Sequence, residues 1–150
     1  MNTHAKTVIL LLRLGLGWLF FYTGITKVLT ANWSAAGYLM SAKTFAGYYQ
    51  WLASPTNIGW VSFLNEWGLT LIGISLILGV FVRWSSLAGA VMMIMYYFPV
   101  LEFPYIGKTS FLVDEHILYA LIFVLLFASH AGTYWGLDSI LQKLGYKRLV

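Results

Sequence analysis

The chain has 150 residues, of which 60% are hydrophobic and 9% are charged, and its net charge is +4. Soluble domains carry about 25% charged residues, so these charges are too few to cover a water-facing surface, and the composition indicates an integral membrane protein. The basic residues are scattered singly, which does not favour nucleic acid as a partner. Cysteine is absent, which excludes disulfides, thiolate nucleophiles, iron–sulfur clusters, cysteine zinc sites and the cysteine-pair chemistry of thiol-oxidising four-helix membrane enzymes.

Four long apolar runs are the main elements predicted along the chain. A helix needs about 20 apolar residues to cross a bilayer, and these runs cover residues 7–29, 58–82, 84–101 and 112–130. The first run is too long for a cleavable signal peptide and carries Arg13 within it. The sequence therefore predicts an all-α protein, a four-helix transmembrane bundle that forms a single domain over residues 1–150.

Two segments outside these runs are expected to lie at the membrane surface. Residues 35–53 are too polar to cross the bilayer but are rich in tyrosine and tryptophan, so a short interfacial or re-entrant helix is expected there. Residues 137–150 combine apolar residues at helical spacing with charged ones. This pattern predicts a C-terminal amphipathic helix that lies at the interface or docks against a partner.

The distribution of basic residues predicts the orientation of the helices, because cytoplasmic loops of membrane proteins are enriched in Lys and Arg. One set of span ends carries Lys6, Arg13, Arg83, Lys143, Lys147 and Arg148, and the other carries Lys27, Lys43 and Lys108. The larger set is expected to be cytoplasmic. The prediction is a multi-pass protein of the plasma membrane, with both termini in the cytoplasm and residues 35–53 facing outward.

Small and polar residues recur on one face of each of the first two predicted helices. At 100° per residue, one stripe contains Arg13, Gly17, Phe20, Gly24 and Lys27, and the other contains Gly59, Ser62, Glu66, Thr70 and Gly73. Small residues let helices approach closely inside a membrane, so both stripes are expected to face the interior of the bundle.

Glu66 is the most costly of these side chains, because a carboxylate deep in a spanning helix must be paired or protonated. A Lys27–Glu66 pair in the outer half of the bundle is the simplest arrangement. Two structural alternatives stay open. In the first, the flexible stem of Lys27 would let its ammonium reach the lipid headgroups. In the second, Arg13 would reach the headgroups at the cytoplasmic end or pair with Asp138.

The cluster Asp114-Glu115-His116 is the other concentration of ionisable groups. Asp114 is well placed as a helix N-cap. Successive helical residues point about 100° apart, so either Glu115 or His116 is expected to face inward, and a histidine beside carboxylates can transfer protons near neutral pH. His130 lies about 21 Å from His116 by helix rise, too far for a shared metal ion, and no metal or haem motif is evident.

Several short motifs follow one another along the chain. They are Arg13-Leu14-Gly15-Leu16-Gly17, Gly24-Ile25-Thr26-Lys27, Gly37-Tyr38-Leu39, residues 71–79 with Arg83, residues 114–117 with Tyr119-Ala120, Ala131-Gly132 and Gly136-Leu137-Asp138. In this order and spacing the chain resembles the DoxX family of small membrane proteins, and within it the DoxD-like large subunit of thiosulfate:quinone oxidoreductase. The resemblance implies a four-helix bundle, a link to quinone-coupled oxidation of sulfur compounds, and a separate small subunit.

The expected function is a membrane subunit of a quinone-linked oxidoreductase that acts on thiosulfate or a related sulfur compound. Its catalytic residues would be Glu66, Glu115 and His116, which would handle protons, and its substrate- and quinone-binding residues would be Lys27, Arg13 and Asp114. Quinone is the expected cofactor, and the expected partners are membrane lipid and a second subunit or further copies of the chain. Two alternatives remain: a non-catalytic anchor or assembly partner of a redox complex, and a small proton-coupled transporter.

Overall fold

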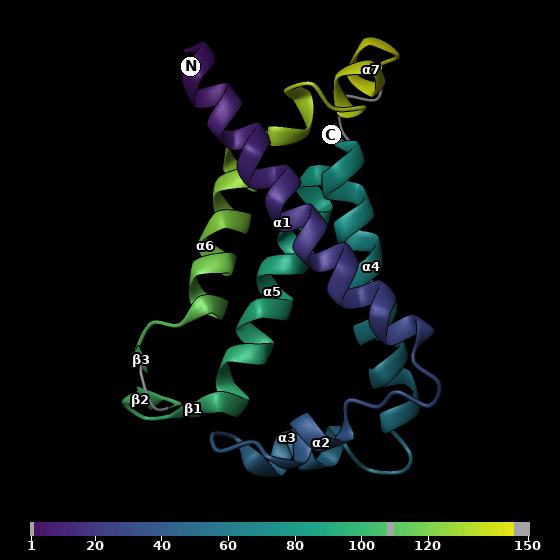
Figure 1. Ribbon diagram of the computed structural model, residues 1–150, viewed down its shortest axis with the longest axis vertical. Coiled ribbons are helices and arrows are strands. Elements are labelled where there is room, and N and C mark those ends of the chain that lie inside the picture. Colours follow the sequence, from purple (N-terminus) through teal and green to yellow (C-terminus); the bar gives the residue numbers. More distant parts are fainter. Residues whose placement is uncertain (1, 108–109, 146–150) are drawn as a thin grey trace.

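A computed structural model describes residues 2–107 and 110–145. The chain is mostly helical, and Figure 1 shows long helices running between two ends of the molecule. The long helices are α1 (Thr3–Leu29), α4 (Ile58–Leu78), α5 (Val82–Val100) and α6 (Glu115–Ala128). The short ones are α2 (Ala36–Met40), α3 (Ala46–Leu52), the 3₁₀ turn η1 (Ala131–Thr133) and α7 (Asp138–Lys143). The N-terminus, η1 and α7 lie at one end, and α2 and α3 lie at the other (Figure 1).

A small antiparallel sheet joins α5 to α6 and was not predicted. Its strands are β1 (Leu101–Glu102), β2 (Tyr105–Ile106) and β3 (Ser110–Phe111), in the order β1-β2-β3. Two-residue strands contain no repeating pattern that a sequence analysis can detect. The last long helix, α6, is shorter at both ends than the predicted run 112–130, because the sheet precedes its start at Glu115 and the helix ends at Ala128, before η1.

Two of the described helices, α1 and α4, are long and apolar enough to cross a membrane, and only a third of each spanning window is buried inside the protein. α5 has 19 residues and α6 has 14. Large apolar side chains are exposed on all four helices, for example Leu11, Phe63, Val91 and Leu121. Exposed apolar surface on this scale marks contact with lipid or with partners, so these helices indicate a membrane protein.

Glycines bring α1 and α4 into close contact. A Cβ atom on Gly24 would lie 2.5 Å from Thr70 Oγ1, and one on Gly73 would lie 2.5 Å from Phe21 Cα. Gly17 is buried in the same contact. The predicted interior faces of the two helices are therefore confirmed at these positions. The prediction is wrong for Gly59, which is exposed and has nothing within 4 Å of an added Cβ, because it lies beyond the contact with α1.

The second tight pair is α5 with α6. Gly89 leaves room for the ring of Phe123, whose Cε1 would lie 2.5 Å from an added Cβ, and Phe123 packs edge-on against Phe20 of α1 with 5.0 Å between ring centroids. In contrast, α4 and α5 are closest near the turn that joins them, where Ser75 Oγ lies 2.7 Å from Ser85 Oγ. Figure 1 shows α4 and α5 diverging from this turn, with α2 and α3 across the wide end.

Arg13 is buried at the end of the molecule that carries η1. Its side chain is 1% exposed, and Nη1 donates hydrogen bonds to the carbonyl oxygens of Ala131 at 2.8 Å and Tyr134 at 3.1 Å. Gly79 and Gly136 leave the space that the guanidinium occupies, since a Cβ on either would lie 2.8 Å from Nη1. Arg13 therefore joins the C-terminal segment to the helices and does not extend to the headgroups.

Asp138, the first residue of α7, also joins the C-terminal segment to the long helices. Its carboxylate is 1% exposed and accepts hydrogen bonds from the backbone N–H groups of Phe81 at 2.7 Å and Val82 at 3.1 Å, at the start of α5. Burial raises the pKa of the Asp138 carboxyl, while the two N–H donors and the nearby charge of Arg13 oppose that rise. Asp138 thus caps α5 and acts on Arg13 through space, although no direct ion pair joins the two among the described residues.

Candidate functional site

A cavity of about 1000 Å³ occupies the space between the diverging α4 and α5. Its volume is at the upper end of the range typical of small-molecule sites, about 300–1,000 Å³. Its side chains come from α1, α2, α3, α4, α5 and α6, and many are aromatic. The polar and aromatic side chains that line it are Lys27, Trp33, Ser34, Tyr38, Tyr48, Tyr49, Trp60, Asn65, Tyr96 and His116.

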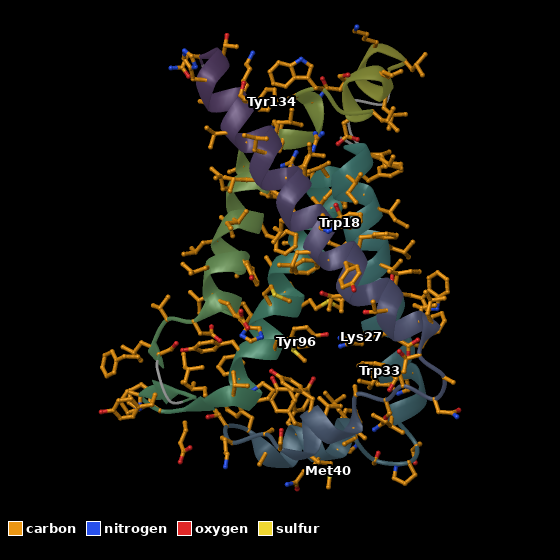
Figure 2. All side chains as sticks on the ribbon, in the orientation of Figure 1. Trp18, Lys27, Trp33, Met40, Tyr96 and Tyr134 are labelled. Carbon is orange, nitrogen blue, oxygen red and sulfur yellow. The ribbon has the colours of Figure 1, made fainter. Side chains whose placement is uncertain are left out.

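Lys27 reaches into this cavity from the last turn of α1. Its Nζ donates a hydrogen bond of 2.8 Å to Asn65 Oδ1 on α4 and lies 4.7 Å from the ring centroid of Trp33 and 5.8 Å from that of Tyr96. Figure 2 shows the side chains of Lys27 and Tyr96 pointing toward one another. An ammonium held by an amide oxygen and aromatic faces keeps two N–H groups for a ligand.

Tyr96 connects Lys27 to His116 across the cavity. The amide nitrogen of Asn65 donates to the Tyr96 hydroxyl, so one asparagine side chain bonds both Lys27 and Tyr96. The Tyr96 ring also packs edge-on against the His116 imidazole, with 6.0 Å between centroids. Because its oxygen accepts from Asn65, the Tyr96 hydroxyl keeps its own proton to donate.

Asp114 fixes the orientation of His116. The carboxylate of Asp114 caps α6 by accepting from the backbone N–H groups of His116 and Ile117, as the sequence predicts. Its Oδ2 also lies 2.5 Å from His116 Nδ1. With Nδ1 occupied in this way, Nε2 is the ring nitrogen that remains to meet a ligand.

Tyrosine hydroxyls hold α2 and α3 against the end of α5. Pro99 lies inside α5 and has no N–H, so it leaves the carbonyl of Met95 without its helical partner. Tyr49 supplies that partner, because its hydroxyl donates to Met95 O at 2.8 Å. Tyr38 likewise donates to the carbonyl of Tyr96 at 2.6 Å. Burial raises the pKa of Tyr38, and it raises the pKa of Tyr49 to about 12, so both hydroxyls stay protonated donors at neutral pH.

The substitution Tyr49→Phe is expected to loosen this end of the cavity. It leaves the Met95 carbonyl unpaired, which costs about 1–3 kcal/mol. The thermal midpoint of purified protein should fall, and amide hydrogen exchange in residues 36–52 should accelerate. Tyr48→Phe is the matched control, since Tyr48 is the exposed neighbour and should leave both measurements unchanged. Equal effects of the two substitutions would contradict this role of Tyr49.

The structure brings some of the predicted site residues together and separates others. Lys27 and His116 line one cavity, and Asp114 supports it from behind. Glu66 is half-buried and is absent from the cavity lining. Within the described part of the chain, Lys27 and Glu66 form no ion pair, and Asn65 takes the expected place of Glu66.

The other two predicted residues lie away from the cavity. Glu115 is exposed, so His116 is the member of that cluster that faces inward. Arg13 precedes Lys27 by fourteen residues, or about 21 Å of helix rise, and is bonded at the opposite end. Within residues 2–107 and 110–145, no three His, Asp or Glu side chains are grouped closely enough to hold a metal ion.

Asn65, Tyr96 and Trp33 are site residues that the sequence analysis missed. A signal for Asn65 was present, because a polar amide inside a predicted span needs a partner just as a charge does. Tyr96 and Trp33 gave no such signal, because aromatic residues near span ends are common at membrane interfaces.

Comparison with known proteins gives one family. No curated protein and no solved structure matches the chain significantly. The profile of the DoxX family matches residues 8–101, which include most of α1, all of α2 to α5 and the residues Lys27, Asn65 and Tyr96. The motifs at residues 114–120 and 131–138 lie beyond this match. Since the match covers well over half of the sequence, the chain belongs to the DoxX family.

Proposed function

We propose that this chain is a membrane subunit of a quinone-linked oxidoreductase and that the cavity between α4 and α5 binds the quinone. In this proposal all four long helices cross the plasma membrane, with both termini in the cytoplasm and α2 and α3 outside. The observation that carries the proposal is the presence of two hydrogen-bond donors, Lys27 and Tyr96, and the protonatable imidazole of His116 in one aromatic cavity.

The residues of the cavity fit the head of a quinone. A quinone ring is flat and apolar and carries two carbonyl oxygens that accept hydrogen bonds. Trp33 and Tyr96 provide aromatic faces beside the ring. Lys27 and the Tyr96 hydroxyl have protons free to donate to a carbonyl oxygen, and the imidazolium form of His116, whose Nδ1 donates to Asp114, can donate from another side through Nε2.

Reduction of a quinone to its quinol takes two electrons and two protons. The electrons would come from the donor, for which thiosulfate or a related sulfur compound is the candidate by likeness to DoxD-like proteins. His116, oriented by Asp114, is the group best placed to deliver a proton. The positive charge of Lys27 would stabilise negative charge that develops on the quinone oxygen. Glu66 and Glu115 remain candidates for proton supply from outside the cavity.

Other parts of the proposal concern partners. The chain contains no cysteine, so electron transfer through thiol groups or iron–sulfur clusters would need another protein. A second subunit that carries the donor site is therefore part of the proposal.

Arg13 is assigned a structural role, because its guanidinium is already bonded to two carbonyl groups.

The test is quinone binding by purified protein in lipid nanodiscs. Lys27→Met should weaken binding of a water-soluble benzoquinone by about tenfold to a hundredfold, because a hydrogen bond to a charged group contributes about 1.5–3 kcal/mol. The control is Lys43→Met, which removes an exposed charge at the same end of the molecule and should leave binding unchanged.

Quinone reduction with thiosulfate as the donor, with and without co-purified partners, then tests the reaction. Wild-type protein that binds no quinone would sink the proposal and favour the anchor or assembly role. Proton-coupled flux into liposomes without quinone binding would favour the transporter instead.

A further inference from the structure

The two ends of the cavity differ in chemistry. Its wide end, next to α2 and α3, carries the polar groups of Lys27, Asn65, Tyr96 and His116. Its narrow end lies deeper between α4 and α5 and is lined by Gly68, Leu71, Ile72, Ala88, Val91 and Met92. A ligand that fills the whole cavity must therefore have a polar head and an apolar extension.

The mouth of the narrow end is apolar and faces sideways. Leu64, Leu71 and Val91 line the cavity and are also 56%, 56% and 57% exposed, so they form its edge. Thr70 of α4 packs against α1 at Gly24. Leu71, the next residue, points about 100° away from Thr70 around the helix. The mouth at Leu71 therefore opens beside the contact between α1 and α4. Apolar side chains exposed in the middle of long apolar helices face the acyl chains of the bilayer.

Gly68, Ala88 and the flexible side chain of Met92 line this passage. The end of Met92 lies over Gly68, because Met92 Cε would lie 2.9 Å from a Cβ added there. Ala88 contributes only a methyl group. From Tyr96 to Ala88 the passage follows α5 for about 12 Å of helix rise.

We propose that the ligand enters this cavity sideways from the membrane and that it is a quinone with a long apolar tail. Its ring lies at the polar end beside Lys27 and Tyr96, and its tail leaves between α4 and α5 past Ala88 and Leu71. This inference rests on the proposed function and adds to it the class of quinone and the route of entry.

The experiment compares two probes and two variants in phosphatidylethanolamine–phosphatidylglycerol nanodiscs. The probes are a dimethoxy-methyl-benzoquinone without a tail and the same ring with a decyl tail, and binding is measured by quenching of tryptophan fluorescence. Ala88→Phe fills the passage. Leu87→Phe is its control, because Leu87 is exposed on α5 outside the cavity lining. A second blocking variant, Leu71→Phe, covers the case that Ala88→Phe does not fold.

The expected result is that Ala88→Phe weakens binding of the tailed quinone at least about tenfold, while the tailless ring and the Leu87→Phe control bind like wild type. If both blocking variants bind the tailed quinone normally, the sideways route is wrong and the quinone site itself survives. If wild-type protein binds neither probe, the proposed function fails and this inference fails with it. A co-purified phospholipid in the passage that the decyl quinone cannot displace would also overturn it.

Discussion

Arg13→Met is expected to lower the free energy of unfolding by about 3–5 kcal/mol, the usual cost of removing one member of a buried charged group. The substitution removes the donor that binds the carbonyls of Ala131 and Tyr134. It also leaves the buried carboxylate of Asp138 without the nearby positive charge. For a domain of this size the thermal midpoint should fall by on the order of 10 °C.

The control for this prediction is Arg83→Met. Arg83 is exposed and lies 4.8 Å above the ring of Phe127, a contact that contributes about 0.5–1 kcal/mol at exposed sites. Its replacement should change the midpoint only slightly. Quinone binding gives a second readout, since Arg13 lies far from the cavity and folded Arg13→Met protein should bind quinone normally. Normal stability combined with lost binding would mean that Arg13 belongs to the ligand site, as the sequence first predicted.

Gly24→Leu is expected to separate α1 from α4. Even a Cβ atom at this position would lie 2.5 Å from Thr70 Oγ1 and 2.8 Å from Thr70 Cα, and backbone atoms cannot move aside without moving the helix. Overpacking of this kind costs about 1–3 kcal/mol and sometimes more, so the thermal midpoint in detergent should fall clearly. Because Lys27 lies one turn further along α1, quinone binding should also weaken.

Gly15 provides a matched control on the same helix. It is exposed, and an added Cβ would have nothing within 4 Å. Gly15→Ala should raise stability by up to about 1 kcal/mol, because alanine favours the helix over glycine, whereas Gly24→Ala should lower it. Effects of the same sign at both positions would show that the α1–α4 contact is not as close as the structure has it.

The sequence was sufficient for features that depend on composition and periodicity. The shortage of charges indicated a membrane protein, and the apolar runs located the four long helices to within a few residues at most ends. The stripes on α1 and α4 identified their contact faces, because a helical period of 3.6 residues determines which side chains share a side. Asp114 was recognisable as an N-cap because capping depends on a local hydrogen bond.

Only the tertiary structure decided which side chains from different helices meet. Asn65 and Glu66 are neighbours that point about 100° apart, and the way α1 crosses α4 selects Asn65 as the partner of Lys27. Arg13 finds its acceptors more than one hundred residues away, in a segment whose path no local pattern predicts. The cavity exists because α4 and α5 diverge while α1 and α6 hold them from outside. Periodicity specifies a face of each helix, whereas partners and cavities depend on how those faces are placed against one another.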